Sequence, residues 1–539
     1  MTRSYNGLIR PDIWPPKLNF DASRNSTPVN YISPSNGVIN IDVGRQLFVD
    51  DFLIEKTSLS RVFYSPKKSD KNPILLPTSK VELDRGECPV AAPFNDGVWW
   101  DDRQRIFKMW YHAGWMRGTA YAESNDGLHW DRPDLGIVPG SNLVLPMREG
   151  YLRDGGCVWL DSFTPNSNER FKMFQFYRLP DGSESGEIYT SADGVHWNFE
   201  TQTGLLGDNS TFFYNPFIEK WVYSIRTHKL QDSPTSSNVR TRLYREHSNF
   251  VKGATWDVNE PVMWSWSDHL DHPDGNIGDI PQLYDLNAVP YESLMLGLFS
   301  IFYGPDNQVA QRDGVPKIND LQIGFSRDGF HWDRTSRDAF IPSERTKGSW
   351  DRAYIHAAGG VCLVVGDELF FYYGAWSGES PNLKGGSMGQ HSRANAMYAG
   401  GSTGLAVLRR DGFASLTAGS TGGALTTKAV NFSGNSLFVN CDTSAGQLKV
   451  EILDSENNPI SPFIRDNCFP ISVDSTKQLV SWKETSDMST LRGKQVKFKM
   501  HLVNGEIYSF WVSQSQSVKS NGYVAAGGPE YRGSIDTGE

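Results

Sequence analysis

One seven-residue pattern occurs three times in the chain and constrains its fold more than any other feature. The pattern S-x-D-G-x-H-W occupies residues 124–130, 191–197 and 326–332. Asp-Gly is a tight-turn signal between strands because glycine readily adopts positive φ, and the tryptophan that follows can anchor the next strand in the core. The pattern therefore predicts an all-β protein of repeated sheets, in which the histidine of each turn is structural.

A second pattern divides residues 84–416 into five units. Each unit reads as a polar residue, an apolar strand, a turn and an aromatic-rich strand, as in D-G-G-C-V-W-L-D at 154–161 followed by F-K-M-F-Q-F at 171–176. No long amphipathic helix competes with these strands. Repeated all-β units of this length are typical of the blades of a β-propeller. We expect residues 46–54 to supply the strand that closes the ring.

The composition changes after the fifth unit, which predicts a second domain. Residues 418–424 are rich in Gly, Ser and Thr, and alternating strands follow them, as in a β-sandwich. The expected fold is therefore all-β, a five-bladed β-propeller followed by a β-sandwich domain. The expected divisions are an extension that wraps the surface (1–45), the propeller (46–417), the sandwich (425–512) and a loosely held tail (513–539).

Charge and composition narrow the classes of partner and cofactor. The net charge of −10 over 539 residues argues against a nucleic-acid partner, and no apolar run approaches the ~20 residues that span a membrane. The N-terminus lacks a signal-peptide pattern, so the chain either stays in the cytoplasm or follows a removed leader, as in a periplasmic or secreted protein. The five cysteines match no zinc or disulfide framework, although a Cys441–Cys468 bridge is an alternative. No metal site and no required cofactor are predicted, and a structural calcium ion held by carboxylates is kept as an alternative.

The residues that open the inner strands of a propeller point into a shared funnel. Several carboxylates in one funnel repel one another, so at least one should have a raised pKa, as general acid–base catalysis needs. The alternative is that each of these residues only caps a strand or orders a turn. The candidate catalytic residues are Asp96, Asp154, Asp208, Asp279 and His356.

Loops on the same face of the ring are expected to bind the substrate. Several of their residues are arginines, which pair well with carboxylate or sulfate oxygens, so an acidic sugar is predicted. The alternative for each arginine is an ordinary surface ion pair, and the adjacent residues 351 and 352 could pair with each other. The candidate binding residues are His112, Trp115, Arg117, Arg153, Arg178, Arg226, His228, Tyr303, Asp351, Arg352, Tyr354 and Trp376.

Three features together resemble a known superfamily. They are Asn95-Asp96-Gly97 before a strand, the repeated turns, and the closing stretch L-R-G-K-Q-V-K-F-K-M-H-L at 491–502 with Y-S-F-W at 508–511. Over residues 46–512 the chain resembles the glycoside hydrolase superfamily of families 32 and 43, which implies a propeller with a sandwich. The resemblance implies Asp96 as base or nucleophile, Asp154 as transition-state stabiliser and Asp208 at the position of the acid.

This chain departs from the family pattern at two places. The family-32 sequence around the first Asp is N-D-P-N-G, whereas Gly97 follows Asp96 directly here. The acid of the family is a Glu, and Asp208 stands at the matching position. Both departures concern the chemistry rather than the fold.

Three functions follow as expectations. The first is a glycoside hydrolase acting on a poly- or oligosaccharide, through the funnel carboxylates. The second is a polysaccharide lyase or oligosaccharide dehydratase, in which arginine neutralises a terminal uronic acid and His356, Tyr354, His112 or Tyr303 removes its C5 proton. The third is a non-catalytic sugar-binding propeller. All three have a carbohydrate partner, and none involves a nucleic acid or a membrane.

Overall fold

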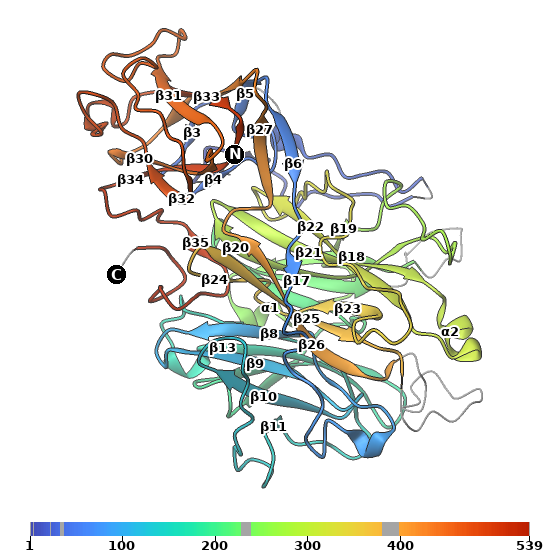
Figure 1. Cartoon of the computed structure of the whole chain (residues 1–539). Helices are drawn as coiled ribbons and strands as arrows, with labels where there is room; N and C mark the ends of the chain where they lie inside the picture. Colours follow the sequence, from blue (N-terminus) through green and yellow to red (C-terminus); the bar gives the residue numbers. More distant parts are fainter. Residues whose placement is uncertain are drawn as a thin grey trace.

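The chain is built almost entirely from β-strands (Figure 1). The computed structural model describes residues 2–3, 5–21, 23–32, 37–227, 239–379 and 398–537. Within these ranges there are two α-helices, α1 (Phe250–Gly253) and α2 (Asn307–Asp313), neither long enough to cross a membrane. The short 3-10 helices are Asn30–Ile32, Asp84–Gly86, Ser167–Glu169 and Ser489–Leu491. The all-β prediction is confirmed.

Three antiparallel sheets of four strands follow one another from residue 91 to 265. The first contains β8 (Ala91–Asp101), β9 (Ile106–Ala113), β10 (Gly118–Ser124) and β11 (Leu143–Leu145). The second contains β12 (Leu152–Leu160), β13 (Phe171–Arg178), β14 (Glu184–Ser191) and β15 (Asn198–Gln202). The third contains β16 (Thr211–Asn215), β17 (Lys220–Thr227), β18 (Thr241–His247) and β19 (Val262–Ser265).

Two further sheets recruit strands from the ends of the chain. The fourth contains β20 (Gln282–Glu292), β21 (Leu294–Gly304), β22 (Ile318–Ser326) and β35 (Tyr523–Val524). The fifth contains β23 (Ala353–Ala357), β24 (Leu363–Val365), β25 (Glu368–Trp376), β26 (Gly401–Arg409) and β7 (Lys67–Lys68). Strand β8 contacts β12, β16 contacts β20, and β23 contacts both β22 and β8. The fifth sheet therefore returns to the first.

Two more sheets lie beside these five and enclose an apolar core of their own. One contains β32 (Asp474–Leu479), β30 (Ser436–Asp442), β34 (Gly505–Ser513), β27 (Ala414–Ala418), β6 (Ser60–Phe63) and β4 (Gln46–Leu47). The other contains β31 (Gln447–Leu453), β33 (Lys497–Val503), β28 (Gly423–Thr427) and β5 (Ile54–Thr57). Short pairs join β1 (Thr2–Arg3) to β2 (Ile9–Arg10) and β3 (Ile39–Asn40) to β29 (Val430–Asn431).

Two predictions about the ends of the chain are wrong. Residues 46–54 do not close the ring, because β4 pairs with β34 and β5 pairs with β28, so the blue strands lie among the orange-red ones in Figure 1. The tail is not loosely held, because β35 pairs with β20 and buries Val524 and Ala526. In addition, Cys441 and Cys468 are free thiols rather than a disulfide.

The repeated turn owes its shape to its Asp and Gly. The Asp126 carboxylate accepts the backbone N–H groups of Leu128 and His129, both at 2.8 Å, and its other oxygen lies 2.7 Å from Nδ1 of His129. Gly127 adopts φ +74°, a conformation that favours glycine. The same contacts recur around Asp193 and Asp328. The structural role predicted for these histidines is confirmed.

Candidate active site

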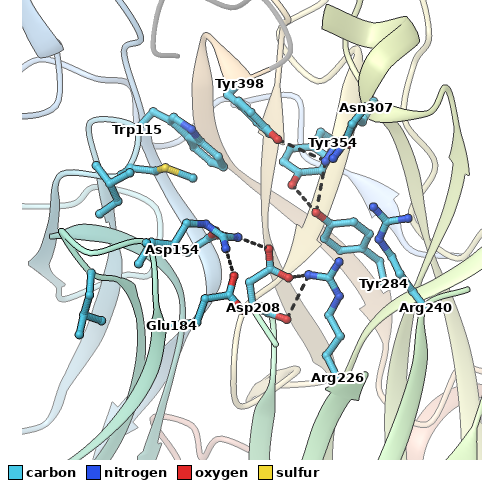
Figure 2. A pocket seen from close by; sticks show the side chains of 16 residues that line it. Trp115, Asp154, Glu184, Asp208, Arg226, Arg240, Tyr284, Asn307, Tyr354 and Tyr398 are labelled. Atoms are coloured by element: carbon cyan, nitrogen blue, oxygen red, sulfur yellow. Dashed lines mark hydrogen bonds and ion pairs between the residues drawn. The ribbon is translucent and has the colours of Figure 1, made fainter. Parts of the chain in front are cut away.

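A cavity of about 430 Å³ opens where the five sheets meet (Figure 2). Each sheet contributes lining residues from its strands or the loops beside them. Three acidic and four basic side chains line it, together with aromatic rings. The charged and aromatic lining residues are Trp115, Asp154, Arg178, Glu184, Asp208, Arg226, Arg240, Tyr284, Lys317, Tyr354 and Tyr398.

Arg178 joins all three acidic groups of the cavity. Its Nη2 lies 2.9 Å from Oδ2 of Asp154 and 2.7 Å from Oδ2 of Asp208. Its Nη1 pairs with Glu184, whose side chain is 44% exposed. Burial alone would lower the pKa of Arg178, but the charges of Asp154 and Glu184 raise it. The guanidinium therefore stays charged beside the three carboxylates.

Asp208 contacts a second guanidinium, that of Arg226. Burial, reinforced by the charge of Arg240, lowers the pKa of Arg226 to about 10. Arg226 is still charged at neutral pH, so Asp208 lies between two cations. This environment suits a carboxylate that acts ionised and does not suit a protonated acid.

Lys317 lies buried on the side of the cavity formed by tyrosines. Its Nζ is 3.3 Å from the Tyr398 hydroxyl and 3.5 Å from the Tyr284 hydroxyl, and the Tyr284 and Tyr354 hydroxyls are 2.8 Å apart. Burial, followed by the charges of Arg240 and Arg226, lowers the pKa of Lys317 well below its usual value. No carboxylate of the described residues forms an ion pair with this amine.

Arg240 is the fourth basic group of the cavity. Its Nη1 donates to Oε1 of Gln282 at 2.8 Å, and its guanidinium lies over the rings of Tyr284 and Phe302, at 5.2 and 4.8 Å from their centroids. Within the described ranges its Nε has no hydrogen-bond partner, and no Asp or Glu pairs with it.

Only part of the predicted catalytic set lines the cavity. Asp154 and Asp208 line the cavity as expected. Asp96 does not, because it is buried, pairs with Arg153, and accepts the backbone N–H of Phe94 at 2.8 Å. Burial raises the pKa of Asp96 although the Arg153 charge opposes the shift.

Neither of the residues predicted for the fourth and fifth inner strands, Asp279 and His356, lines this cavity. His356 is fully buried, and its Nδ1 lies 2.9 Å from Oδ2 of Asp285. Burial lowers the pKa of His356, and Asp285 partly opposes this shift. Asp279 precedes β20, accepts the N–H of Asp306 at 3.1 Å, and lines a separate cavity. Asp279 therefore does not reach the main cavity; the residue of β20 that lines it is Tyr284, whereas Asp285 is buried beside His356.

Four of the predicted binding residues line the cavity: Trp115, Arg178, Arg226 and Tyr354. Trp115 stacks on Tyr398 with ring centroids 4.2 Å apart and an interplanar angle of 11°. His228 lies outside the described residues.

The other predicted binding residues have structural partners or lie elsewhere. Three are held by local contacts: His112 accepts the Met116 N–H at 2.8 Å, Arg117 pairs with Asp84, and Asp351 pairs with Lys68 rather than with its neighbour. The remaining four are Arg153 on Asp96, Trp376 in the aromatic core, Tyr303 beside Gln322, and Arg352 in the separate cavity.

Sequence reasoning missed Glu184, Arg240, Tyr284, Lys317 and Tyr398. Tyr284 lies in the inner-strand pattern Q-L-Y-D-L. Because side chains alternate along a strand, this pattern places Tyr284 on the same side as Leu286 and on the opposite side from Asp285. The other four belong to loops or strand ends, where no periodicity marks them. Within the described ranges no three His, Cys, Asp or Glu side chains gather as metal ligands do, and the calcium ion stays a prediction.

Comparison with known proteins gives remote structural neighbours. No protein-family model and no curated protein sequence matches this chain. An N-acetylgalactosamine deacetylase from F. plautii is 15% identical, with 66% of this chain and 96% of that chain covered and a TM-score of 0.43. A thermostable family-43 glycoside hydrolase is 14% identical, with 60% and 94% covered and a TM-score of 0.40. A fructofuranosidase from Schwanniomyces occidentalis is 12% identical, with 83% and 99% covered and a TM-score of 0.37.

These neighbours include glycoside hydrolases of the kinds that the sequence motifs resemble. At such low similarity they do not assign a reaction to this chain.

Proposed function

We propose that this chain is a carbohydrate-active enzyme of the glycoside hydrolase type, acting on a poly- or oligosaccharide. The observation that carries the proposal is the meeting of Asp154, Asp208 and Glu184 in one open cavity beside the Trp115 ring. Carboxylates cleave glycosidic bonds. We interpret the five sheets as the blades of a propeller and the two remaining sheets as a sandwich.

In this proposal the ionised carboxylates act on the sugar ring. Because Arg178 and Arg226 hold Asp208 ionised, we assign it the part of base or nucleophile, and we assign stabilisation of the positively charged transition state to Asp154. The protein group that protonates the leaving oxygen is then one without a guanidinium partner. The candidates beside the cavity are Lys317 and the hydroxyls of Tyr284 and Tyr354.

An acidic sugar is part of the proposal. Four basic side chains outnumber three acidic ones in the cavity, in a chain whose net charge is −10. A ligand with a carboxylate or sulfate would give an anionic partner to Arg240, which forms no ion pair with an Asp or Glu of the described residues.

The buried amine favours a second candidate reaction, β-elimination from a uronic acid. Lys317 lies 3.5 Å from the Tyr284 hydroxyl, so a neutral amine can accept a proton through the tyrosine. The base would take the C5 proton, the C4–O bond would break, and the leaving oxygen would take a proton, giving a C4–C5 double bond. Hydrolysis instead adds one water across the broken bond.

One experiment separates these reactions. The purified chain is incubated with a panel of acidic and neutral oligosaccharides, and the products are analysed by mass and ultraviolet absorbance. Hydrolysis gives fragments whose summed mass exceeds the substrate by one water, whereas elimination gives an absorbing unsaturated product and no added water. Binding without conversion would support the non-catalytic sugar-binding protein and reject the enzyme.

A further inference from the structure

The cavity has two halves that differ in charge (Figure 2). In one half Asp154, Glu184 and Asp208 are joined to guanidinium groups, so their charges are largely compensated. In the other half Arg240 and the buried Lys317 lie among tyrosine rings. No acidic group of the described residues pairs with either of these two basic groups. The positive charge that no carboxylate compensates therefore lies on the tyrosine side, on Arg240.

Tyrosine side chains contact both basic groups of this half. Lys317 has the hydroxyl of Tyr398 at 3.3 Å and lies 5.3 Å from the Tyr354 ring centroid, and Lys317 and Arg240 both lie over the Tyr284 ring. Cation–π contacts stabilise the charge of Arg240 without neutralising it. A buried cation without a counter-ion is costly to keep charged, and an anionic ligand removes that cost.

We propose that Arg240 and Lys317 form the subsite that binds an anionic group of the sugar, the carboxylate of a uronic acid or a sulfate ester. The inference deepens the proposed function and rests on it, because it assigns the acidic group of the substrate to one side of the same cavity. It also fixes the orientation of the sugar. With its anion on the tyrosine side, the reacting bond faces Asp154 and Asp208 on the other side.

Binding at this subsite should be coupled to the uptake of a proton. Burial and the neighbouring cations lower the pKa of Lys317 in the unliganded protein, and a bound anion acts in the opposite direction. A bound anion therefore favours the protonated amine, and we expect proton uptake on binding at pH values near the pKa of this amine. The charged and titratable groups that face the amine are Arg178, Arg226, Arg240, Asp154, Tyr284, Tyr354 and Tyr398.

Calorimetric titration of the full chain with three simple sugars tests the proposal. The probes are D-glucuronate, glucose 6-sulfate and glucose, each titrated in two buffers that differ in ionisation enthalpy. We expect at least one anionic probe to bind about tenfold or more tighter than glucose, with proton uptake in the wild type. The preference for glucuronate or for the sulfate identifies the anion.

Two variants and a matched control complete the experiment. Arg240→Gln and Lys317→Met should each weaken anionic binding about tenfold, and Lys317→Met should abolish proton uptake. Arg312→Gln removes an exposed arginine of α2 that pairs with Asp313, and it should leave binding unchanged. If Lys317→Met fails to fold, Arg240→Gln and the proton uptake of the wild type still decide the question.

The outcomes separate this inference from the proposed function. Equal affinity for anionic and neutral sugars, or anionic binding that Arg240→Gln leaves unchanged, overturns the anion subsite. If neutral oligosaccharides are nevertheless cleaved, the proposed function stands and only the subsite is rejected. If no saccharide is bound or converted, both are rejected.

Discussion

Replacing Asp208 by asparagine separates the charge of this residue from its shape. Oδ2 of Asp208 lies 2.7 Å from Nη2 of Arg178, and the same carboxylate pairs with Arg226. The side chains of Arg226 and Asp208 are only 3% and 14% exposed. Asparagine keeps the volume and one acceptor oxygen, but it leaves Arg226 without a counter-ion.

Two magnitudes follow for Asp208→Asn. Breaking a buried ion pair costs about 3–5 kcal/mol, and the retained acceptor offsets part of this, so the free energy of unfolding should fall by about 2–4 kcal/mol. Removing a group that acts on the reacting bond should lower kcat by about 10²–10⁴-fold. The fold itself should persist, because the substitution creates no cavity.

The assay combines denaturant unfolding with turnover of the oligosaccharide that the wild type converts. Asp313→Asn is the matched control, since it removes an exposed carboxylate that pairs with Arg312, and it should leave the free energy of unfolding almost unchanged. A variant with unchanged kcat would refute the catalytic assignment of Asp208. A stability loss no larger than that of the control would refute the electrostatic argument.

Two further predictions concern binding and pH. Trp115→Ala should reduce the free energy of unfolding by about 3–5 kcal/mol and weaken sugar binding, because it removes a buried ring stacked on Tyr398. Trp115→Phe should reduce stability and binding less, because it keeps an aromatic ring. Equal losses from the two variants would contradict this prediction. Burial, with the Arg153 charge, lowers the pKa of His112, and burial lowers that of His356. The unfolded chain therefore takes up protons that the folded chain excludes, and stability should fall as pH decreases below about 6.5. Urea unfolding at several pH values measures this dependence. In His112→Asn the free energy of unfolding should change less steeply with pH, and an unchanged slope in that variant would count against the prediction.

Local patterns predicted the fold more reliably than the site. The Asp-Gly turns and aromatic strands depend on neighbouring residues, so they could be recognised in the sequence, and contacts such as those of Asp126 confirm them. The strand pairings of residues 46–63 could not be recognised, because their partners lie hundreds of residues away.

The candidate site could be predicted only in part, because it depends on which residue of each strand or loop faces the cavity. Asp154 and Asp208 line the cavity as expected, whereas Asp279 lines a separate cavity and β20 contributes Tyr284 instead. Lys317 gave no signal, because one lysine before an apolar strand resembles any surface residue. Only its burial among tyrosine rings, which results from the assembly of several sheets, distinguishes it.

The most direct test of the account is a crystal structure of the Asp208→Asn variant with an acidic oligosaccharide bound. We expect a sugar in the cavity beside Trp115, with its anionic group on Arg240 and Lys317 and a glycosidic oxygen near residues 154 and 208. A sugar bound in the separate cavity beside Asp279, or one whose anionic group points away from Arg240, would contradict it.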